Sequence, residues 1–534
     1  MILITSGAYV QGELVTEVGL LPPSFLPIGN KRLYEYQIEL LRRSFTEEEI
    51  FLSLPASFKI STVDIDRLNE LQVSILYVPE DLSLGNSILY CWNATAKIFH
   101  HLKILHGDTL FTDCNLADGN AISIHQNKGV YKRATFGATN QALSTIHDEW
   151  AFDKANVISG YFSFESPLIF MKSLVERNGD FVKAIADYNV LSEFELLSAG
   201  AWLDFGHVNS FFSSRTQMTT QRAFNELIIT SRYVEKHSKE KDEKIFAEGR
   251  WYTDIPSELR LHTPQLLSLK GEEQSSYKLE YMYLLPLSDL YVFGSLPVQQ
   301  WGAIFNAISD TLSDFKRYVP KEEDINVKIF DSLYLEKTML RLDSFFKNNN
   351  DIQRERKYKL GNTDTYVTLE QIAIESANFI SSTSLEDVCV SHGDFCFSNI
   401  LFDSKVECIK CIDPRGLLPD GTMSVYGDRR YDVAKLYHSV IGLYDFIIAG
   451  HYRLKDTEFG LSISFPILDD IQNDIFDSFS ETVLGATGYG ENEIIAINIQ
   501  LFLSMLPLHA DRPDRQTAFI ANAIRLYENL RRVQ

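Results

Sequence analysis

The sequence predicts two domains: an α/β domain with a parallel, doubly wound sheet, and after it an α+β domain made of two lobes. Strand-like apolar runs alternate with helix-like stretches over residues 1–215. Apolar and polar residues then alternate over 224–238, as in the strands of a small sheet, and apolar spacings of three and four dominate after residue 296. We expect domains at 1–218 and 219–534, the second with lobes at 219–295 and 296–534.

Composition limits the classes of function. The 534 residues carry a formal charge of −22, which argues against a nucleic-acid partner or an anionic membrane surface. Six cysteines are too few for a disulfide framework, and the pair Cys408 and Cys411 lies in a strand-like segment. The first residues lack the pattern of a signal peptide, and no run reaches ~18 apolar residues. We expect a cytoplasmic protein without membrane insertion, and its oligomeric state stays open.

Two aspartates mark the predicted ligand-binding edge of the first sheet. Parallel sheets bind ligands at the carboxyl ends of their strands. Asp108 follows the strand-like segment 103–111, and Asp204 lies near the end of another predicted strand. Two such carboxylates are what Mg²⁺-dependent nucleotidyl transfer requires, because the metal bridges the phosphates during attack. The other predicted elements are strands at 1–5, 50–55 and 73–79, a helix after the turn Gly29-Asn30, and a helix at 87–99.

Residues 1–215 resemble the sugar-nucleotide pyrophosphorylases. The matching segments, in order, are LPIGNKRLYEYQ (26–37), GNSILY (85–90), HGDTLF (106–111), ISGYFSFES (158–166) and LDFGHVNSFFSSR (203–215). The resemblance implies a nucleotidyltransferase-like domain of GT-A or Rossmann-like fold, with Asp108 and Asp204 as metal ligands. It also implies a second nucleoside triphosphate, CTP or UTP.

This domain departs from that family where cations are expected. The family's Gly-rich loop carries an Arg, whereas the loop SGAYVQGEL (6–14) has no basic residue. Pro23 and Ser24 stand where the family has a Lys, and Lys31 with Arg32 are the cations left to bind the nucleotide. Losing cations that stabilise transition-state charge raises the barrier. The sequence therefore leaves open whether this domain is active.

Three polar residues near position 400 organise the second domain. In VSHGDFCFSNILFDSKVECIKCIDPRG (390–416), Asn399 follows Asp394 by five residues, and Asp413 ends the next strand-like run. Phosphoryl transfer from ATP needs one carboxylate to orient the attacking hydroxyl, and an amide oxygen with a second carboxylate to hold Mg²⁺. We assign the first role to Asp394 and the second to Asn399 and Asp413.

The segment resembles the aminoglycoside phosphotransferase and choline kinase branch of the protein-kinase-like fold. Its opening is His-Gly-Asp instead of His-Arg-Asp, Pro414-Arg415-Gly416 follows the metal aspartate, and GDRRYDVAKLYHS (427–439) comes next. The resemblance implies a bilobal kinase domain that phosphorylates small molecules. It also implies a structural role for the aspartates of the last segment, Asp428 and Asp432.

The small lobe supplies the expected phosphate-binding pair. Lys236 ends a predicted strand and Glu248 lies on the following helix, as a strand lysine and its fixing glutamate require, with Glu243 as the alternative glutamate. No Gly-rich phosphate loop is visible between 210 and 232. Residues 280–294 read as a paired strand and hinge that binds the adenine, and the polar stretch 346–365 reads as a loop.

These features predict a bifunctional enzyme. Its second domain would phosphorylate a sugar, polyol or amino alcohol with ATP and Mg²⁺, and its first would activate the product as a nucleotide derivative. Fused pairs resembling this one supply capsule and other bacterial surface polysaccharides, which is the role we expect. Two alternatives remain: a monofunctional kinase with an inactive nucleotidyltransferase-like module, and a non-enzymatic nucleotide sensor or scaffold.

Overall fold

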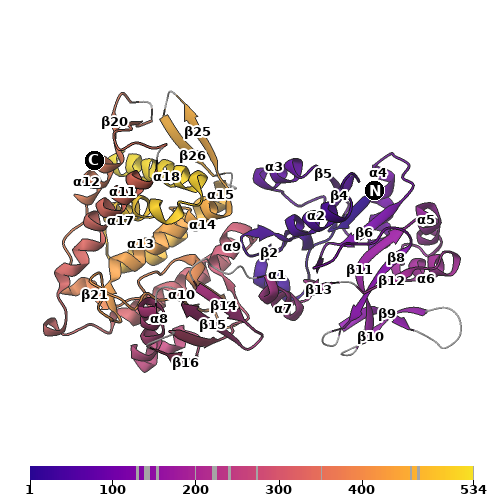
Figure 1. Cartoon of the computed structure of the whole chain (residues 1–534), viewed down its shortest axis with the longest axis horizontal. Helices are drawn as coiled ribbons and strands as arrows, with labels where there is room; N and C mark the ends of the chain where they lie inside the picture. Colours follow the sequence, from indigo (N-terminus) through magenta and orange to yellow (C-terminus); the bar gives the residue numbers. More distant parts are fainter. Residues whose placement is uncertain are drawn as a thin grey trace. The chain divides into compact units, whose positions relative to one another are not determined.

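The chain divides into two compact units (Figure 1): Met1–Met218 with Phe293–Ser295, and Thr219–Val292 with Leu296–Gln534. Ser295 joins the first unit because its backbone N–H donates to the carbonyl of Val18 at 2.8 Å. The computed structural model describes residues 1–127, 131–137, 145–151, 155–198, 200–218, 225–238, 242–271, 275–349, 351–361, 363–457, 460–465 and 469–532.

A nine-stranded sheet forms the centre of the first unit among its described residues. Strands β1 (Ile2–Thr5), β4 (Ile50–Pro55), β5 (Val73–Val78) and β6 (Leu102–His106) are parallel, as the alternation of strands and helices predicts. The prediction of a wholly parallel sheet is wrong, because β11 (Asn156–Phe164) is antiparallel to β6. Further strands are β8 (Ala121–Gln126), β9 (Tyr131–Gly137), β10 (Thr145–Ala151) and β12 (Glu195–Leu197).

Apolar side chains cover both faces of this sheet. Leu3, Ile104 and Phe162 point to one face, where they form a core with residues of α4, α5 and α6. Ile2 and Ile4 alternate with Leu3 and are also fully buried, so the opposite face is covered too. The helices of this unit are α1 (Glu13–Val18), α2 (Leu33–Ser44), α3 (Thr62–Glu70), α4 (Leu84–Ala94), α5 (Pro167–Glu176), α6 (Phe181–Leu191) and α7 (Val208–Met218).

The predicted strand over 103–111 is two strands. β6 ends at His106, and β7 (Thr109–Thr112) begins after the turn of Gly107 and Asp108. A β-carbon on Gly107 would lie 2.7 Å from the carbonyl oxygen of Thr5, so only glycine permits this close approach. β7 then pairs with β13 (Ala201–Asp204) and sets Asp204 opposite Thr109, which brings the two predicted metal ligands to the same sheet edge. A short hairpin, β2 (Pro27–Ile28) and β3 (Lys31–Arg32), precedes α2.

The small lobe of the second unit is a four-stranded antiparallel sheet in the order β14-β15-β17-β16, with one helix, α8 (Asp242–Asp254), packed on it. The paired strand predicted over 280–294 is wrong for its second half, because α9 (Leu287–Phe293) follows β18 (Leu285–Pro286). The buried residues Leu287, Leu290, Tyr291 and Phe293 have helical spacing. The sheet strands are β14 (Asn225–Ile229), β15 (Tyr233–Ser238), β16 (Leu266–Lys270) and β17 (Ser276–Glu280).

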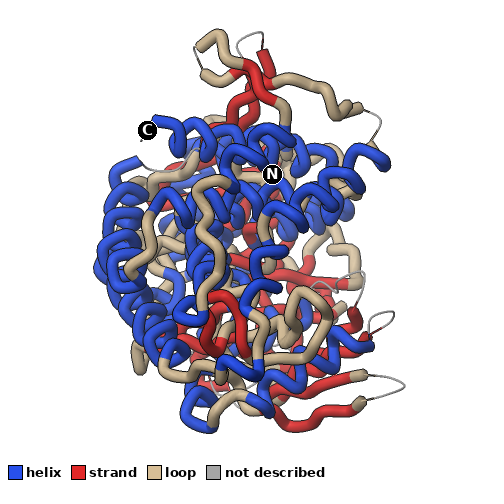
Figure 2. Tube along the Cα trace, turned by 90° about the vertical axis from the view of Figure 1, so that its left-hand side faces the viewer, coloured by secondary structure: helices blue, strands red, loops and turns tan. Residues whose placement is uncertain are grey.

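Helices build the large lobe, where they pack against one another (Figure 2). The central one is α17 (Glu491–Ser504), which contacts four other helices and buries every residue from Ile494 to Ser504. The remaining elements are α10 (Val298–Lys316), α11 (Leu335–Asn348), α12 (Leu369–Ala377), α13 (Arg429–Val440), α14 (Tyr444–Ala449), α15 (Asp469–Phe479), α16 (Gly485–Thr487), α18 (Pro513–Arg532), and strands β19 (Tyr358–Lys359), β20 (Tyr366–Val367), β21 (Val388–Val390), β22 (Ile400–Asp403), β23 (Cys408–Cys411), β24 (Tyr426–Asp428), β25 (Arg453–Thr457) and β26 (Gly460–Ser464). Among the described residues, no helix has both the length and the apolar character needed to cross a bilayer.

Replacing Phe162 by Ala tests the core of the first unit. Phe162 is 1% exposed and contacts the rings of His106 and Phe181, so the cavity should lower the free energy of unfolding by about 3–5 kcal/mol. Urea denaturation followed by circular dichroism measures the change. Leu168→Ala, at a position 65% exposed, is the matched control and should change it by less than about 0.5 kcal/mol. Equal effects of the two changes would contradict this account of the core.

Candidate functional site

The carboxylate of Asp432 holds the loop that follows β21. It lies in the first turn of α13 and accepts hydrogen bonds from the Ser391 hydroxyl and the backbone N–H groups of His392 and Gly393, each at 2.8 Å. A β-carbon on Gly393 (φ +75°) would lie 2.8 Å from the Arg415 β-carbon, so the loop requires glycine there. Asp432 therefore fixes the backbone immediately before Asp394.

Asn399 and Lys435 both contact Asp394. The Asn399 amide donates to the Asp394 carbonyl at 2.9 Å and to its Oδ2 at 3.2 Å. Lys435, on α13, places Nζ 2.8 Å from Asp394 Oδ1. Burial opposes ionisation of Asp394, but the charge and hydrogen bond of Lys435 outweigh it and hold the pKa of this carboxyl well below its usual value. Lys435 therefore favours the ionised form of Asp394.

Asp413 meets the lysine and glutamate predicted in the small lobe. Lys236 Nζ lies 2.6 Å from Glu248 Oε2 and 3.2 Å from Asp413 Oδ1. Burial alone would lower the pKa of Lys236, but Asp413 and Glu248 offset it and raise that pKa. The Tyr277 hydroxyl lies between the two carboxylates, 3.2 Å from Glu248 Oε2 and 3.3 Å from Asp413 Oδ1.

Helix α8 connects the small lobe to both loops of the site. Its Trp251 indole N–H donates to the Ser391 carbonyl at 2.9 Å, and its Tyr252 hydroxyl accepts from the Asp413 N–H at 3.2 Å. A β-carbon on Gly416 (φ +66°) would lie 2.2 Å from the Ala247 carbonyl oxygen, so α8 packs directly on the chain after Asp413. The helix that carries Glu248 is therefore already joined to the loops that carry Asp394 and Asp413.

Hydrogen bonds also join the two loops to each other. His392 Nε2 lies 2.9 Å from the Ile412 carbonyl oxygen, which can only accept, so this nitrogen carries the proton. The Ile412 N–H in turn donates to the Asn399 carbonyl at 2.9 Å. Asp413 has φ 58°, a left-handed conformation that is unfavourable for a non-glycine residue and that clusters at functional sites. The structure thus brings Asp394, Asn399, Asp413, Lys236 and Glu248 into one connected site.

An asparagine and an aspartate beside a lysine fit Mg²⁺ bound together with a nucleotide. Mg²⁺ in such sites takes one or two protein oxygens, waters and substrate phosphates. Among the described residues, no group of three or more His, Cys, Asp or Glu side chains surrounds a metal position. Asn399 and Asp413 would supply two oxygens to such an ion, and water and phosphate oxygens the rest. In the small lobe, a side-chain hydroxyl orders the turn between β14 and β15. Thr230 Oγ1 accepts hydrogen bonds there from the backbone N–H groups of Arg232 and Tyr233.

Asp108 and Asp204 lie together in the first unit. A β-carbon on Gly206 would be 2.4 Å from Asp108 Oδ2 and 3.3 Å from Asp204 Oδ1, so both carboxylates border this glycine. Burial, and then the charge of Asp204, raises the pKa of Asp108. A cation that the sequence analysis did not identify, Arg133 on β9, forms an ion pair with Asp204.

The basic turn of the first unit does not supply a second cation to these aspartates. Lys31 is exposed and its Nζ lies 5.4 Å from the ring centroid of Tyr36, and its described contacts do not include Asp108 or Asp204. Arg32 is buried and paired with Asp64 at 3.4 Å. Ser24, which replaces the family's lysine, donates to the Gly107 carbonyl at 3.3 Å.

Four residues near the kinase-like site were missed from sequence: Lys435, Tyr431, Arg415 and Lys337. Lys435 carried a usable signal, because it lies three positions after Asp432, within the segment 427–439 that the sequence already singles out. Lys337 carried none, because it lies 94 residues from Tyr431, the side chain that it contacts.

No family model matches the chain, and no curated protein matches it. Solved structures similar to it include the two classes that the sequence resembles. A nucleoside-diphosphate-sugar pyrophosphorylase of Vibrio cholerae is 10% identical over 40% of this chain and 99% of its own, with a TM-score of 0.34. A putative aminoglycoside phosphotransferase of Ralstonia eutropha is 11% identical over 60% of this chain and 98% of its own, with a TM-score of 0.36. A type VIII aminoglycoside-3'-phosphotransferase is 14% identical over 52% of this chain and 93% of its own, with a TM-score of 0.32.

Replacing Asp432 by Asn tests whether its carboxylate holds the loop. The amide has one acceptor oxygen for three donors, so the free energy of unfolding should fall by about 2–4 kcal/mol. Amide hydrogen exchange at residues 391–393 should accelerate more than exchange in β21. Asp420→Asn, on an exposed turn, serves as the control. Unchanged exchange at 391–393 would rule out this role for Asp432.

Proposed function

We propose that the second unit transfers the γ-phosphoryl group of ATP to a hydroxyl group of a small molecule. The observation that supports this most is the connected set of Lys236, Asp413 and Asp394. The Asn399 amide donates to the Asp394 carboxylate at 3.2 Å, and the buried Lys236 reaches the carboxylate of Asp413 at 3.2 Å. Phosphoryl transfer requires this combination because its catalysis is almost entirely positioning and charge stabilisation.

In this proposal each residue has one task. Asp394 accepts a hydrogen bond from the acceptor hydroxyl and takes its proton as the new P–O bond forms and the bond to ADP breaks. Lys236, fixed by Glu248, binds the α- and β-phosphates. Asn399 and Asp413 would hold Mg²⁺, which neutralises phosphate charge when bound.

The charges of the site favour nucleotide binding. Lys236 pairs with Asp413 and Lys435 pairs with Asp394. Bound ATP would bring phosphate oxygens, which can pair with both lysines. Mg²⁺ would bring a positive charge, which can pair with Asp413. Lys435 then lies where it can also bind the phosphoryl group in transfer, a role we add to the site.

Replacing Asp394 by Asn should reduce acceptor-dependent ATP consumption by at least about 10³-fold, because the amide cannot take the proton. A coupled ADP assay over sugars, polyols and amino alcohols measures it. Asp403→Asn, at the end of β22, is the control and should retain activity. Undiminished turnover in Asp394→Asn would contradict the kinase proposal.

For the first unit we propose nucleotidyl transfer to the phosphorylated product. Asp108 and Asp204 would hold Mg²⁺ on CTP or UTP, the phosphate of the product would attack the α-phosphorus, and pyrophosphate would leave. The chemistry of the two units is complementary, because a kinase makes the phosphate that a nucleotidyltransferase consumes. An activated sugar or polyol of this kind suits the synthesis of a bacterial surface polysaccharide by a cytoplasmic enzyme.

A second candidate is a monofunctional kinase whose first unit only binds. The contacts of Ser24 and Arg32 favour it, because neither residue supplies a cation to Asp108 or Asp204: Ser24 bonds to Gly107 and Arg32 pairs with Asp64. Arg133 is then the cation that pairs with Asp204. Pyrophosphate release separates the two candidates. If the first unit is active, product plus CTP or UTP releases pyrophosphate, and Asp108→Asn abolishes this while leaving ADP formation intact. Release from neither nucleotide would support the monofunctional kinase.

A further inference from the structure

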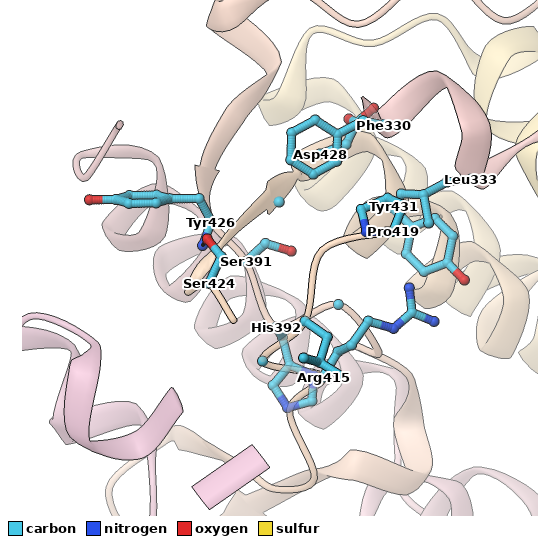
Figure 3. Close-up of a pocket in the computed structure, with 14 residues that line it drawn as sticks. Phe330, Leu333, Ser391, His392, Arg415, Pro419, Ser424, Tyr426, Asp428 and Tyr431 are labelled. Carbon is cyan, nitrogen blue, oxygen red and sulfur yellow. Dashed lines mark hydrogen bonds between the residues drawn. The ribbon is translucent and has the colours of Figure 1, made fainter. Parts of the chain in front are cut away.

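The second unit contains a pocket whose lining includes the basic side chain of Arg415 and the carboxylate of Asp428 (Figure 3). The backbone of His392 and Gly393, directly before Asp394, forms one side of it, and Arg415 and Tyr431 form another. In Figure 3 the Arg415 guanidinium lies near the Tyr431 ring. A group bound here would be next to the proposed catalytic base.

Three cations from three parts of the chain surround Tyr431. Lys337, on α11, places Nζ 3.1 Å from the Tyr431 hydroxyl. The Arg415 guanidinium lies 5.3 Å from the centroid of the Tyr431 ring. Lys435 lies one helical turn after Tyr431 on α13 and reaches Asp394. The cluster therefore extends from the pocket to the catalytic carboxylate.

Within this cluster Lys435 pairs with a carboxylate, that of Asp394. Among the described residues, neither Lys337 nor Arg415 has a carboxylate within ion-pair distance. Asp428 also lines the pocket, but it is paired with Arg430 at 2.7 Å and accepts from the Tyr334 hydroxyl at 2.6 Å. Burial alone would raise the pKa of Tyr431, yet Lys337, Arg415 and Lys435 lower it to about 7. This local cluster of positive charge contrasts with the formal net charge of −22 of the whole chain.

We infer that the phosphoryl acceptor carries an anionic group, a carboxylate or a phosphate, which Lys337, Arg415 and the Tyr431 hydroxyl bind while its hydroxyl meets Asp394. This inference rests on the proposed kinase function and narrows its substrate class. A cationic acceptor would be repelled by the same cluster, because the charges face one another in a partly buried pocket. Neutral sugars and polyols would bind without using it.

Acceptors matched in carbon skeleton test this inference. One series is glucose, glucosamine, glucuronate and glucose 6-phosphate, and the other is glycerol, 3-amino-1,2-propanediol, glycerate and glycerol 3-phosphate. We expect kcat/KM for an anionic member to exceed that of its neutral counterpart by about tenfold or more, as one well-placed charge contact implies. The acids and the phosphates form separate arms, which distinguish the two anionic groups.

The variants assign the effect to the pocket. Lys337→Gln should raise KM for the anionic acceptor by about tenfold with little change in KM for ATP, since Lys337 contacts the hydroxyl of Tyr431, which lines the pocket, and has no role in binding ATP in the proposal. Lys347→Gln removes the same charge from an exposed position on the same helix and should match the wild type.

Each outcome decides the inference. A preference for neutral or amine acceptors, or equal behaviour of the Lys337→Gln and Lys347→Gln variants, overturns it and leaves the kinase proposal intact. If no member of either series raises ATP consumption above the level of Asp394→Asn, the kinase proposal fails and this inference fails with it.

Discussion

The buried carboxylate of Asp432 is the interaction on which the second unit depends. A charge removed from water is costly unless hydrogen bonds replace the lost solvation, and three donors from residues 391–393 do so here. The same contacts fix the backbone that carries Asp394. Asp432, on α13, thus links the packed helices of the large lobe to the position of Asp394, the residue that we propose as the catalytic base.

Paired opposite charges govern the site itself. Each carboxylate proposed to act on substrate or metal has a lysine beside it: Lys435 for Asp394, and Lys236 for Asp413. Such pairs keep buried charges tolerable and hold both partners in place. In the proposed reaction, Mg²⁺ and the phosphates of ATP would bring compensating charges, so new ion pairs would replace the present ones and no charge would be left isolated.

Local spacing made part of the site predictable. Asp394, Asn399 and Asp413 lie within 20 residues and are ordered by one strand pair, so the sequence places them together. Lys236 and Glu248, on a strand and the next helix, were also predictable as a pair. The Lys337 contact with Tyr431 was not, because helix packing joins residues 94 apart. The division of 103–111 into two strands was missed, because a turn at a buried glycine leaves the apolar pattern of the segment unchanged. Helix α9 was missed because strands and helices have similar apolar patterns over so few residues.

We propose that Asp413 and Lys236 bind a nucleotide together with Mg²⁺. Calorimetric titration of the full chain with a non-hydrolysable ATP analogue, with and without Mg²⁺, tests it most directly. We expect Mg²⁺ to raise the affinity by about tenfold or more in the wild type and to have little effect in Asp413→Ala, because that change removes a ligand oxygen together with its charge. Equal affinities with and without Mg²⁺ in the wild type would contradict the claim.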